Sequence, residues 1–133
     1  RNDLCLKMDV EGYEWLSLLF SSDECLLHFN QIIIELHWLN SDLNATIAQK
    51  IDILRKINKN FILVHIHGTN CRESLIVDGF KIHPVVEATF VRNDLLSEHK
   101  IISKPKLPIS LDLPCDSCLH DIKLSEFYPY NNI

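Results

Sequence analysis

Alternation of apolar and polar positions predicts a chain of short strands and helices that begins with a strand near residue 4. This strand ends at two acidic residues, Asp9 and Glu11, and Gly12 then allows a sharp turn into a helix. The pattern continues with a helix over 13–20, a short helix to about residue 30, a strand over 31–38, a helix over 41–58, a strand over 60–68 and a strand over 85–92. This order is typical of the second half of a doubly wound α/β sheet whose last two strands form an antiparallel pair.

The helix over 41–58 has the clearest amphipathic spacing in the chain. Its apolar residues recur every three or four positions, which predicts one buried face. The residues of that predicted face are Leu43, Ile47, Ile51, Leu54 and Ile57.

The character of the sequence changes near residue 97, which divides the chain into a domain portion over 1–96 and a tail over 97–133. Within the domain portion, residues 71–84 are mixed and predict a loop with short extended pieces. Four prolines fall between residues 105 and 129, and the periodicity fades there. We therefore expect an irregular tail that packs along the surface of the preceding residues.

Composition and charge limit the classes of function. The 133 residues are enough for one domain with a core, and 47% hydrophobic with 23% charged residues is ordinary for a soluble globular protein. A net charge of −5 without any run of Lys or Arg argues against a nucleic-acid-binding surface. The apolar stretches are short and interrupted, so we expect no membrane span. A soluble protein is expected, and of the compartments we favour the cytoplasm.

The acidic turn after the first strand belongs to a longer motif. Residues 6–15 read Leu-Lys-Met-Asp-Val-Glu-Gly-Tyr-Glu-Trp. This stretch resembles the K-x-D-x-E-G-x-E signature of FkbM-type and related methyltransferase-like proteins. Two later stretches, 34–37 (Ile-Glu-Leu-His) and 65–70 (His-Ile-His-Gly-Thr-Asn), agree with the same family in the same order, so the resemblance covers roughly residues 4–92.

The resemblance implies the C-terminal half of a Rossmann-like methyltransferase fold, with a mostly parallel sheet and an antiparallel last strand. It also implies S-adenosyl-L-methionine as the cofactor and methyl transfer, most often to oxygen. The family pattern requires a glycine-rich loop for the cofactor and an acidic residue, at the end of the next strand, for its ribose. The chain has neither, since its glycines are Gly12, Gly68 and Gly79. We therefore expect that an upstream half of the same domain is required and that this chain alone is inactive.

Ionisable residues gather near the predicted strand ends, where burying them is costly unless they pair or bind a ligand. On the methyltransferase interpretation, Asp9 contacts the acceptor or the cofactor, Glu11 assists, and His65 or His67 acts as general base because imidazole titrates near neutral pH. The residues expected to bind the acceptor, a small molecule or a glycan, are Glu35, His37, Asn70 and Glu87.

The strand positions of these residues suggest a shared crevice. Alternation places His65 and His67 on the same face of their strand as Leu63. Alternation alone does not establish that the polar faces of different strands lie on one side of the sheet.

Two alternatives remain open. His65 and His67 put two imidazoles on one side of a strand, where they could bind a metal ion in a metal-dependent hydrolase or metal-binding protein. The residues that could complete such a site are His37, Glu35, Asp9 and Glu87. The chain could also be a catalytically inactive methyltransferase-like half-domain.

Cys115 and Cys118 form a C-x-x-C sequence that follows Pro114 in a predicted loop. Redox motifs of this kind begin a helix, and a zinc site needs a second pair of ligands. We assign no function to this pair.

Overall fold

The order of helices and strands in the structure, a computed structural model, follows the order predicted from the sequence. The structure describes residues 3–77, 80–96 and 106–124. Its elements are β1 (Leu4–Met8), α1 (Glu14–Phe20), α2 (Asp23–Leu26), β2 (Phe29–Leu36), α3 (Ile47–Asn58), β3 (Phe61–Gly68), β4 (Leu75–Val77), β5 (Phe80–Ile82), β6 (Val86–Arg92) and η1 (Asn93–Leu95). The segment expected to be a loop with extended pieces contains the small antiparallel β4–β5 pair.

The described residues form a mixed four-stranded sheet with the strand order β1-β2-β6-β3. β1 pairs with β2 in parallel, and β6 pairs with both β2 and β3 in antiparallel orientation. The expectation of a mostly parallel sheet is therefore wrong, because only the β1–β2 pair is parallel and both pairs formed by β6 are antiparallel. The reason is that β6 lies between β2 and β3, so that these two parallel strands do not pair with each other. The last strand of the sheet is antiparallel, as predicted.

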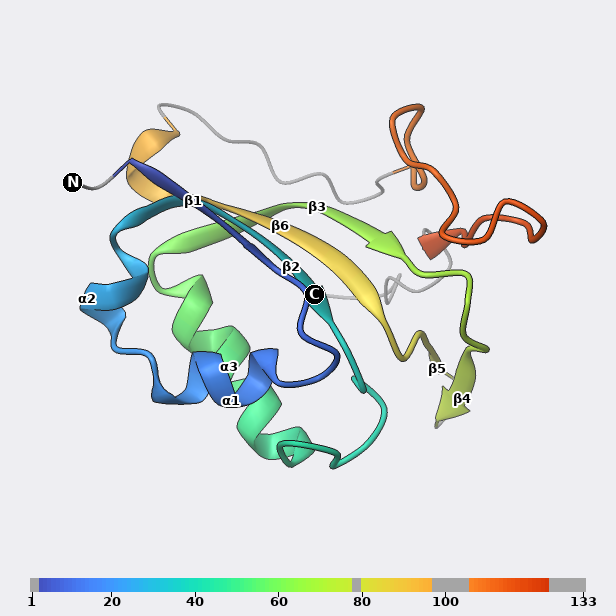
Figure 1. Cartoon of the computed structure of the whole chain (residues 1–133), viewed down its shortest axis with the longest axis horizontal. Helices are drawn as coiled ribbons and strands as arrows, with labels where there is room; N and C mark the ends of the chain where they lie inside the picture. Colours follow the sequence, from blue (N-terminus) through green and yellow to red (C-terminus); the bar gives the residue numbers. More distant parts are fainter. Residues whose placement is uncertain (1–2, 78–79, 97–105, 125–133) are drawn as a thin grey trace.

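Helices α1, α2 and α3 lie on one face of the sheet, as Figure 1 shows. Their apolar side chains meet those of the inner strands β2 and β6 in one core. The largest fully buried side chains of this core are Trp15, Leu18, Ile32, Ile34, Ile53, Ile57 and Phe61.

Helix α3 begins later than predicted, and only Leu54 and Ile57 of its predicted buried face lie at the core. Thr46 caps its first turn in a capping box with Gln49, so the helix starts at residue 47 rather than near 41. Its buried residues are Lys50, Ile53 and Ile57. The predicted buried face is wrong for Leu43, Ile47 and Ile51, which are exposed. Spacing alone missed Lys50 because a lysine is not expected on a buried face.

Strand β3 contains an extra residue that changes the side to which its histidines point. The register between β3 and β6 shifts between Leu63 and His65 and skips Val64. In unbroken alternation His65 would follow Leu63 onto the helix-covered face, but the bulge turns it, and His67 after it, to the opposite face. The prediction that these three residues share one face is therefore wrong for Leu63.

Residues 106–124 lie against the face of the sheet opposite to the helices, beside β3 (Figure 1). Leu107 and Leu124 anchor the two ends of this segment by being buried. Residues 97–105 and 125–133 of the predicted tail lie outside the described residues, so the division at residue 97 stays a prediction.

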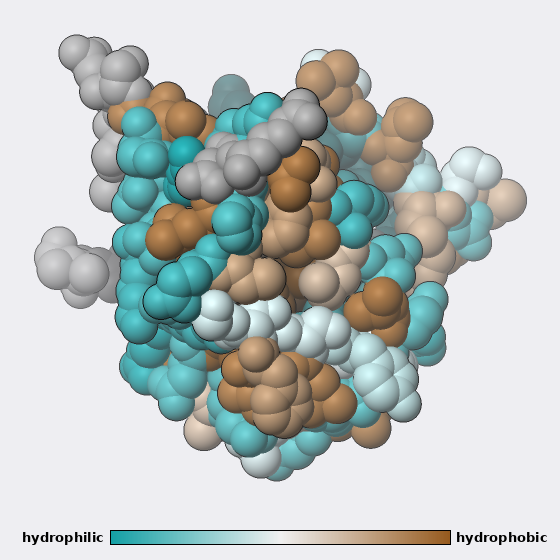
Figure 2. Space-filling view, turned by 60° about the vertical axis from the view of Figure 1, so that its left-hand side comes forward, coloured by the Kyte–Doolittle hydropathy of each residue, from teal (hydrophilic) through white to brown (hydrophobic). Residues whose placement is uncertain are grey.

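The surface of the described residues is mixed in character. On the face drawn in Figure 2, hydrophobic side chains form several separate areas among hydrophilic ones. The longest described helix, α3, has 12 residues, and none of the helices in this part of the chain combines the length and apolar character needed to cross a bilayer.

Candidate functional site

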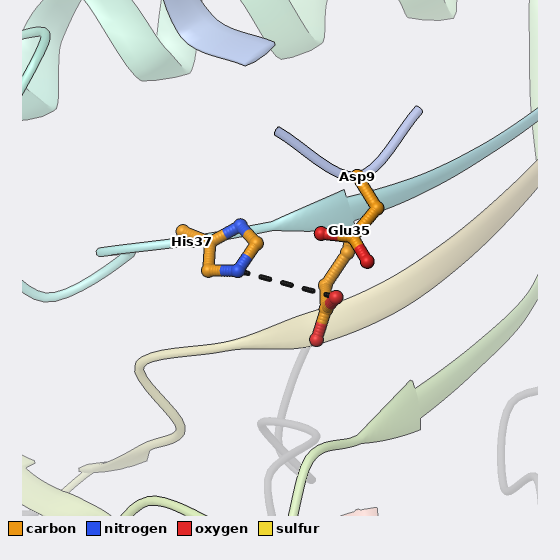
Figure 3. Close-up of side chains that lie close together, drawn as sticks. All are labelled: Asp9, Glu35 and His37. Carbon is orange, nitrogen blue, oxygen red and sulfur yellow. Dashed lines mark ion pairs between the residues drawn. The ribbon is translucent and has the colours of Figure 1, made fainter. Parts of the chain in front are cut away.

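Asp9, Glu35 and His37 meet where the neighbouring parallel strands β1 and β2 end (Figure 3). Each offers one ligand atom, and these three atoms lie within 4.8 Å of one another. The imidazole is buried, the Glu35 carboxylate is half-buried and Asp9 is exposed. The structure thus brings together three of the residues selected from the sequence.

The turn after β1 sets the position of Asp9. Glu11 and Gly12 both have positive φ, 53° and 100°, so the chain reverses within two residues. Gly12 packs directly against the side chains of Trp38 and Asn44, and no β-carbon fits there. The turn therefore requires a glycine for its backbone conformation and also for its close packing.

The carboxylate of Glu14 joins this turn to the end of β2. One oxygen accepts a hydrogen bond from the Gly12 N–H at 2.8 Å, and the other accepts one from the His37 N–H at 2.7 Å. Glu14 is fully buried in the first turn of α1. No specific contact was predicted for Glu14 from the sequence. An acidic residue next to Trp15, on a helix face expected to be buried, could have indicated such a contact.

The same carboxylate orients the His37 ring. Its Oε1 lies 3.3 Å from Nδ1, which favours the tautomer with the proton on Nδ1. Nε2 lies 4.0 Å from the Glu35 carboxylate (Figure 3) and 3.5 Å from the Glu11 carboxylate. A histidine held in this way can accept a proton or bind a metal ion through Nε2.

Two further side chains hold the loop after β2 on its helix side. The Trp15 indole N–H donates to the His37 carbonyl at 2.6 Å. The Lys50 ammonium donates to the carbonyls of Trp38 at 2.6 Å and Ser41 at 2.7 Å. Burial lowers the pKa of Lys50, while Asp42 and Glu14 oppose that change. These contacts fix the backbone of His37, so the ring has little freedom to turn away.

The electrostatics of the site favour a cation. Burial raises the pKa of the Glu35 carboxyl, and the nearby Asp9 carboxylate raises it further. The Thr69 hydroxyl, which donates to Glu35 at 3.1 Å, and His37 act in the opposite direction. Two carboxylates that repel each other are stabilised by any positive group placed between them.

Polar residues of other strands extend the site along the same face of the sheet. Glu35 pairs across strands with Glu87, and Glu87 pairs with His67. The Lys7 ammonium reaches Glu87 at 2.7 Å. The polar side chains of four strands therefore share one side, which alternation alone had left open.

A pocket of about 310 Å³ lies against this row. Glu35, His67 and Glu87 line it from the sheet, and Leu111, Leu113 and Cys115 line it from the C-terminal segment. Because Glu35 belongs both to the pocket and to the cluster with Asp9 and His37, a molecule in the pocket would reach this cluster through Glu35. The volume is at the lower end of that of ligand-binding pockets.

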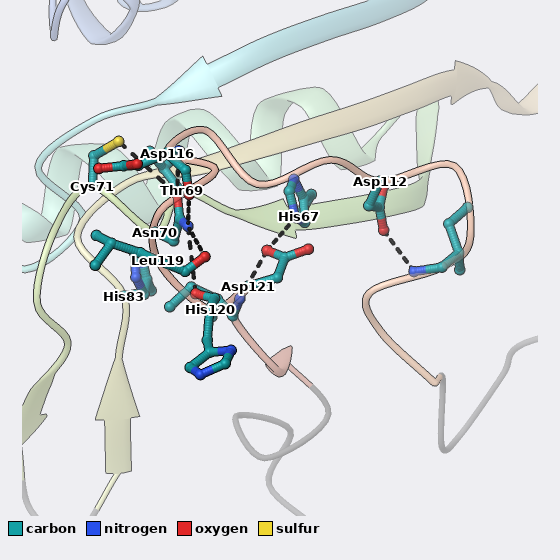
Figure 4. Close-up of polar contacts among 12 residues, drawn as sticks. His67, Thr69, Asn70, Cys71, His83, Asp112, Asp116, Leu119, His120 and Asp121 are labelled. Carbon is teal, nitrogen blue, oxygen red and sulfur yellow. Dashed lines mark hydrogen bonds and ion pairs between the residues drawn. The ribbon is translucent and has the colours of Figure 1, made fainter.

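His65, His67 and Asn70 hold the C-terminal segment, and Figure 4 shows the contacts of His67 and Asn70. His65 Nε2 lies 2.8 Å from Asp112, and His67 Nε2 lies 2.9 Å from Asp121. Within the described part of the chain, neither histidine joins a group of three metal-ligand atoms; only Asp9, Glu35 and His37 form one.

Asn70 is almost completely buried, and its side chain is committed to the same segment (Figure 4). Its amide donates to the Asp116 carbonyl at 2.8 Å, and its oxygen accepts from the Asp116 N–H at 2.8 Å. The structure thus gives Asn70 a structural contact where the sequence suggested acceptor binding.

Comparison with known proteins adds no assignment to this geometry: no protein-family model, no curated protein and no solved structure matches the chain.

Proposed function

We propose that this chain is the C-terminal, acceptor-binding half of an S-adenosyl-L-methionine-dependent methyltransferase domain that methylates oxygen. The observation that carries the proposal is the meeting of Asp9, Glu35 and His37 at the ends of β1 and β2. The signature that resembles FkbM-type proteins supplies Asp9, and its last glutamate, Glu14, orients His37. The antiparallel β3–β6 pair supports the proposal as well, because the sheet of methyltransferase-like proteins ends in an antiparallel pair.

The residues of this chain would handle the acceptor and its proton. His37 Nε2 would accept the proton of an acceptor hydroxyl, with the ring held in place by the contact of Nδ1 with Glu14. Asp9 and Glu35 would stabilise the imidazolium that forms and would orient the hydroxyl. An acceptor in the pocket beside Glu35 would lie within reach of the cluster, and its other hydroxyls could bond to Glu87.

The cofactor, which supplies the methyl group, fits this chain only in part. The negative charge of Asp9 and Glu35 suits a sulfonium cation. The glycines of the described residues, Gly12 and Gly68, pack against protein side chains and provide no open loop for a nucleoside. We therefore assign the nucleoside of the cofactor to an upstream half of the domain.

The first test is calorimetric titration of S-adenosyl-L-methionine into this chain and into a longer chain with its upstream coding sequence restored. We expect binding by the longer chain alone. In that chain, Asp9→Asn should weaken binding about 10-fold or more, because it removes one charge-assisted contact. Asp52→Asn, an exposed acid-to-amide change on α3, should leave it unchanged. Absence of binding by both chains would refute the cofactor, and an inactive half-domain would become the better interpretation.

A divalent cation is the second candidate for the same cluster, because one imidazole nitrogen and two carboxylate oxygens suit Mn²⁺ or Zn²⁺. The buried Glu14 carboxylate behind His37 is the usual outer partner of a metal-binding histidine. This site differs from the one expected from sequence, since His65 and His67 take no part in it.

Titration of Mn²⁺ and Zn²⁺ into the chain tests this candidate. We expect His37→Ala to weaken binding at least 10-fold and the matched change His65→Ala to leave it unchanged. Protons compete with the metal for Glu35, so affinity should fall as the pH is lowered through the raised pKa of this carboxyl, at higher pH than for an ordinary glutamate. Loss of binding in His65→Ala but not in His37→Ala would show that the metal binds at His65 and not at the cluster of Asp9, Glu35 and His37.

A further inference from the structure

Cys71 and Cys115 approach each other from two distant parts of the chain. Their sulfur atoms lie 3.0 Å apart, closer than two sulfurs pack without a bond or a hydrogen bond between them. Cys71 follows β3, and Cys115 belongs to the C-terminal segment that covers the polar face of the sheet. Both residues are exposed, so reagents in solution can reach them.

The neighbouring residues hold the two cysteines in place. Asn70, directly before Cys71, makes a reciprocal pair of hydrogen bonds with the backbone of Asp116, directly after Cys115 (Figure 4). Asn70 is almost completely buried, and its amide also lies within hydrogen-bonding distance of the carbonyls of Leu119 and His120. The sulfurs therefore have to close by only about 1 Å to reach the length of a disulfide, about 2.05 Å.

We propose that Cys71 and Cys115 form a reversible disulfide that fastens the C-terminal segment to the end of β3. With glutathione disulfide as the oxidant, the two protein thiols become one disulfide, and the oxidant becomes two molecules of glutathione. One cysteine sulfur first attacks glutathione disulfide and releases glutathione. The other then attacks the resulting mixed disulfide, releases the second glutathione and closes the bond.

The contact with the Cys71 sulfur, and after it burial, raise the pKa of the Cys115 thiol to about 11. Cys115 is therefore protonated at neutral pH, and Cys71 is the sulfur that begins the exchange. Once Cys71 carries glutathione, Cys115 lies directly beside the mixed disulfide. Cys115 can then act as the resolving thiol.

The bond would fix one wall of the pocket. Cys115 lines the pocket together with Leu111 and Leu113, opposite Glu35. In the reduced protein this wall is held by non-covalent contacts, including the hydrogen bonds of His65 and His67 and the burial of Leu107 and Leu124. In the oxidised protein it is attached covalently. An effect on acceptor entry rests on the proposed function, whereas formation of the bond does not.

Peptide mapping of the whole chain tests the proposal independently of any activity. The chain is incubated with glutathione disulfide, its free thiols are blocked with iodoacetamide, and it is digested with trypsin. We expect a linked pair of the peptides 60–72 and 107–123, which contain Cys71 and Cys115. The oxidised protein should also melt roughly 10 °C above the reduced protein, because the bond closes a long loop.

Three single variants identify the bond. The linked peptides should persist in Cys118→Ser and disappear in Cys71→Ser and in Cys115→Ser. The proposal is overturned by an internal Cys115–Cys118 disulfide within the peptide 107–123 of the wild-type chain. It is equally overturned if the link persists in Cys115→Ser, or if the wild-type thiols stay free at any ratio of glutathione disulfide to glutathione.

Discussion

Replacing Glu14 with alanine should lower the free energy of unfolding by roughly 4 kcal/mol. The change removes the acceptor of two buried backbone N–H groups, those of Gly12 and His37, and each unpaired group costs about 1–3 kcal/mol. It also leaves the His37 ring without its partner at Nδ1. Urea denaturation followed by circular dichroism measures the loss.

Two variants test whether the Glu14 carboxylate is responsible for this loss of stability. Glu14→Gln keeps the shape of the side chain but only one acceptor oxygen, so we expect about half the loss, roughly 2 kcal/mol. Asp52→Asn makes the same chemical change at a surface ion pair with Arg55 and should alter stability by no more than about 0.5 kcal/mol. A Glu14→Gln protein as stable as the wild type would show that one acceptor is enough and would contradict the role of Glu14 in joining the turn to β2.

Replacing Gly12 with alanine should lower the free energy of unfolding by roughly 3 kcal/mol. Gly12 has a φ of +100°, where residues with a β-carbon are strained. The added carbon would also lie 2.6 Å from side-chain atoms of Trp38 and Asn44. The backbone of Trp38 is held in place, since its carbonyl accepts a hydrogen bond from the Lys50 ammonium. The same urea titration measures this effect.

Gly68→Ala is the matched comparison. An added carbon there would meet Ile122 at 2.8 Å, but the backbone does not have a positive φ. Ile122 belongs to the C-terminal segment outside the sheet and can shift, so we expect a loss of about 1 kcal/mol. Equal losses for Gly12→Ala and Gly68→Ala would mean that crowding alone is responsible and that the backbone of the first turn is not under special constraint.

The local sequence pattern predicted which helices and strands form. It did not predict which strands lie next to each other in the sheet. The strand predicted over 31–38 corresponds to β2 and the helix predicted over 13–20 to α1, whose buried apolar residues are Trp15 and Leu18. The position of β6 between β2 and β3 depends on contacts between distant segments, which alternation does not encode. The start of α3 was misplaced because the capping box at Thr46 outweighs the apolar spacing before it.

The residues of the candidate site also include some that the sequence predicts and some whose contacts it does not predict. Asp9, Glu35 and His37 could be selected from sequence because ionisable residues gather at the ends of these strands, where those that are buried need a partner or a ligand. His65 and His67 were selected by the same rule, but their partners are aspartates of a segment without any periodicity, and no pattern pointed to those aspartates.

The roles of Glu14 and Cys71 were not predicted from the sequence. Each looks ordinary in its local context, and its role comes from a residue more than 20 positions away. The available signals for Glu14 were its place as the last glutamate of the K-x-D-x-E-G-x-E signature and its position on an apolar helix face. For Cys71, no signal existed within the sequence around it.

The bulge at Val64 has a consequence for association between copies of the chain. β3 is an outer strand of the sheet, and an outer strand with regular spacing offers a row of backbone groups that another chain can bind. The skipped residue interrupts that row, and Val64 itself is half exposed on it. A chain lacking Val64 would pair with β6 without interruption and still place both histidines on the polar side, so the extra residue protects the edge from aggregation and is not needed to form the site.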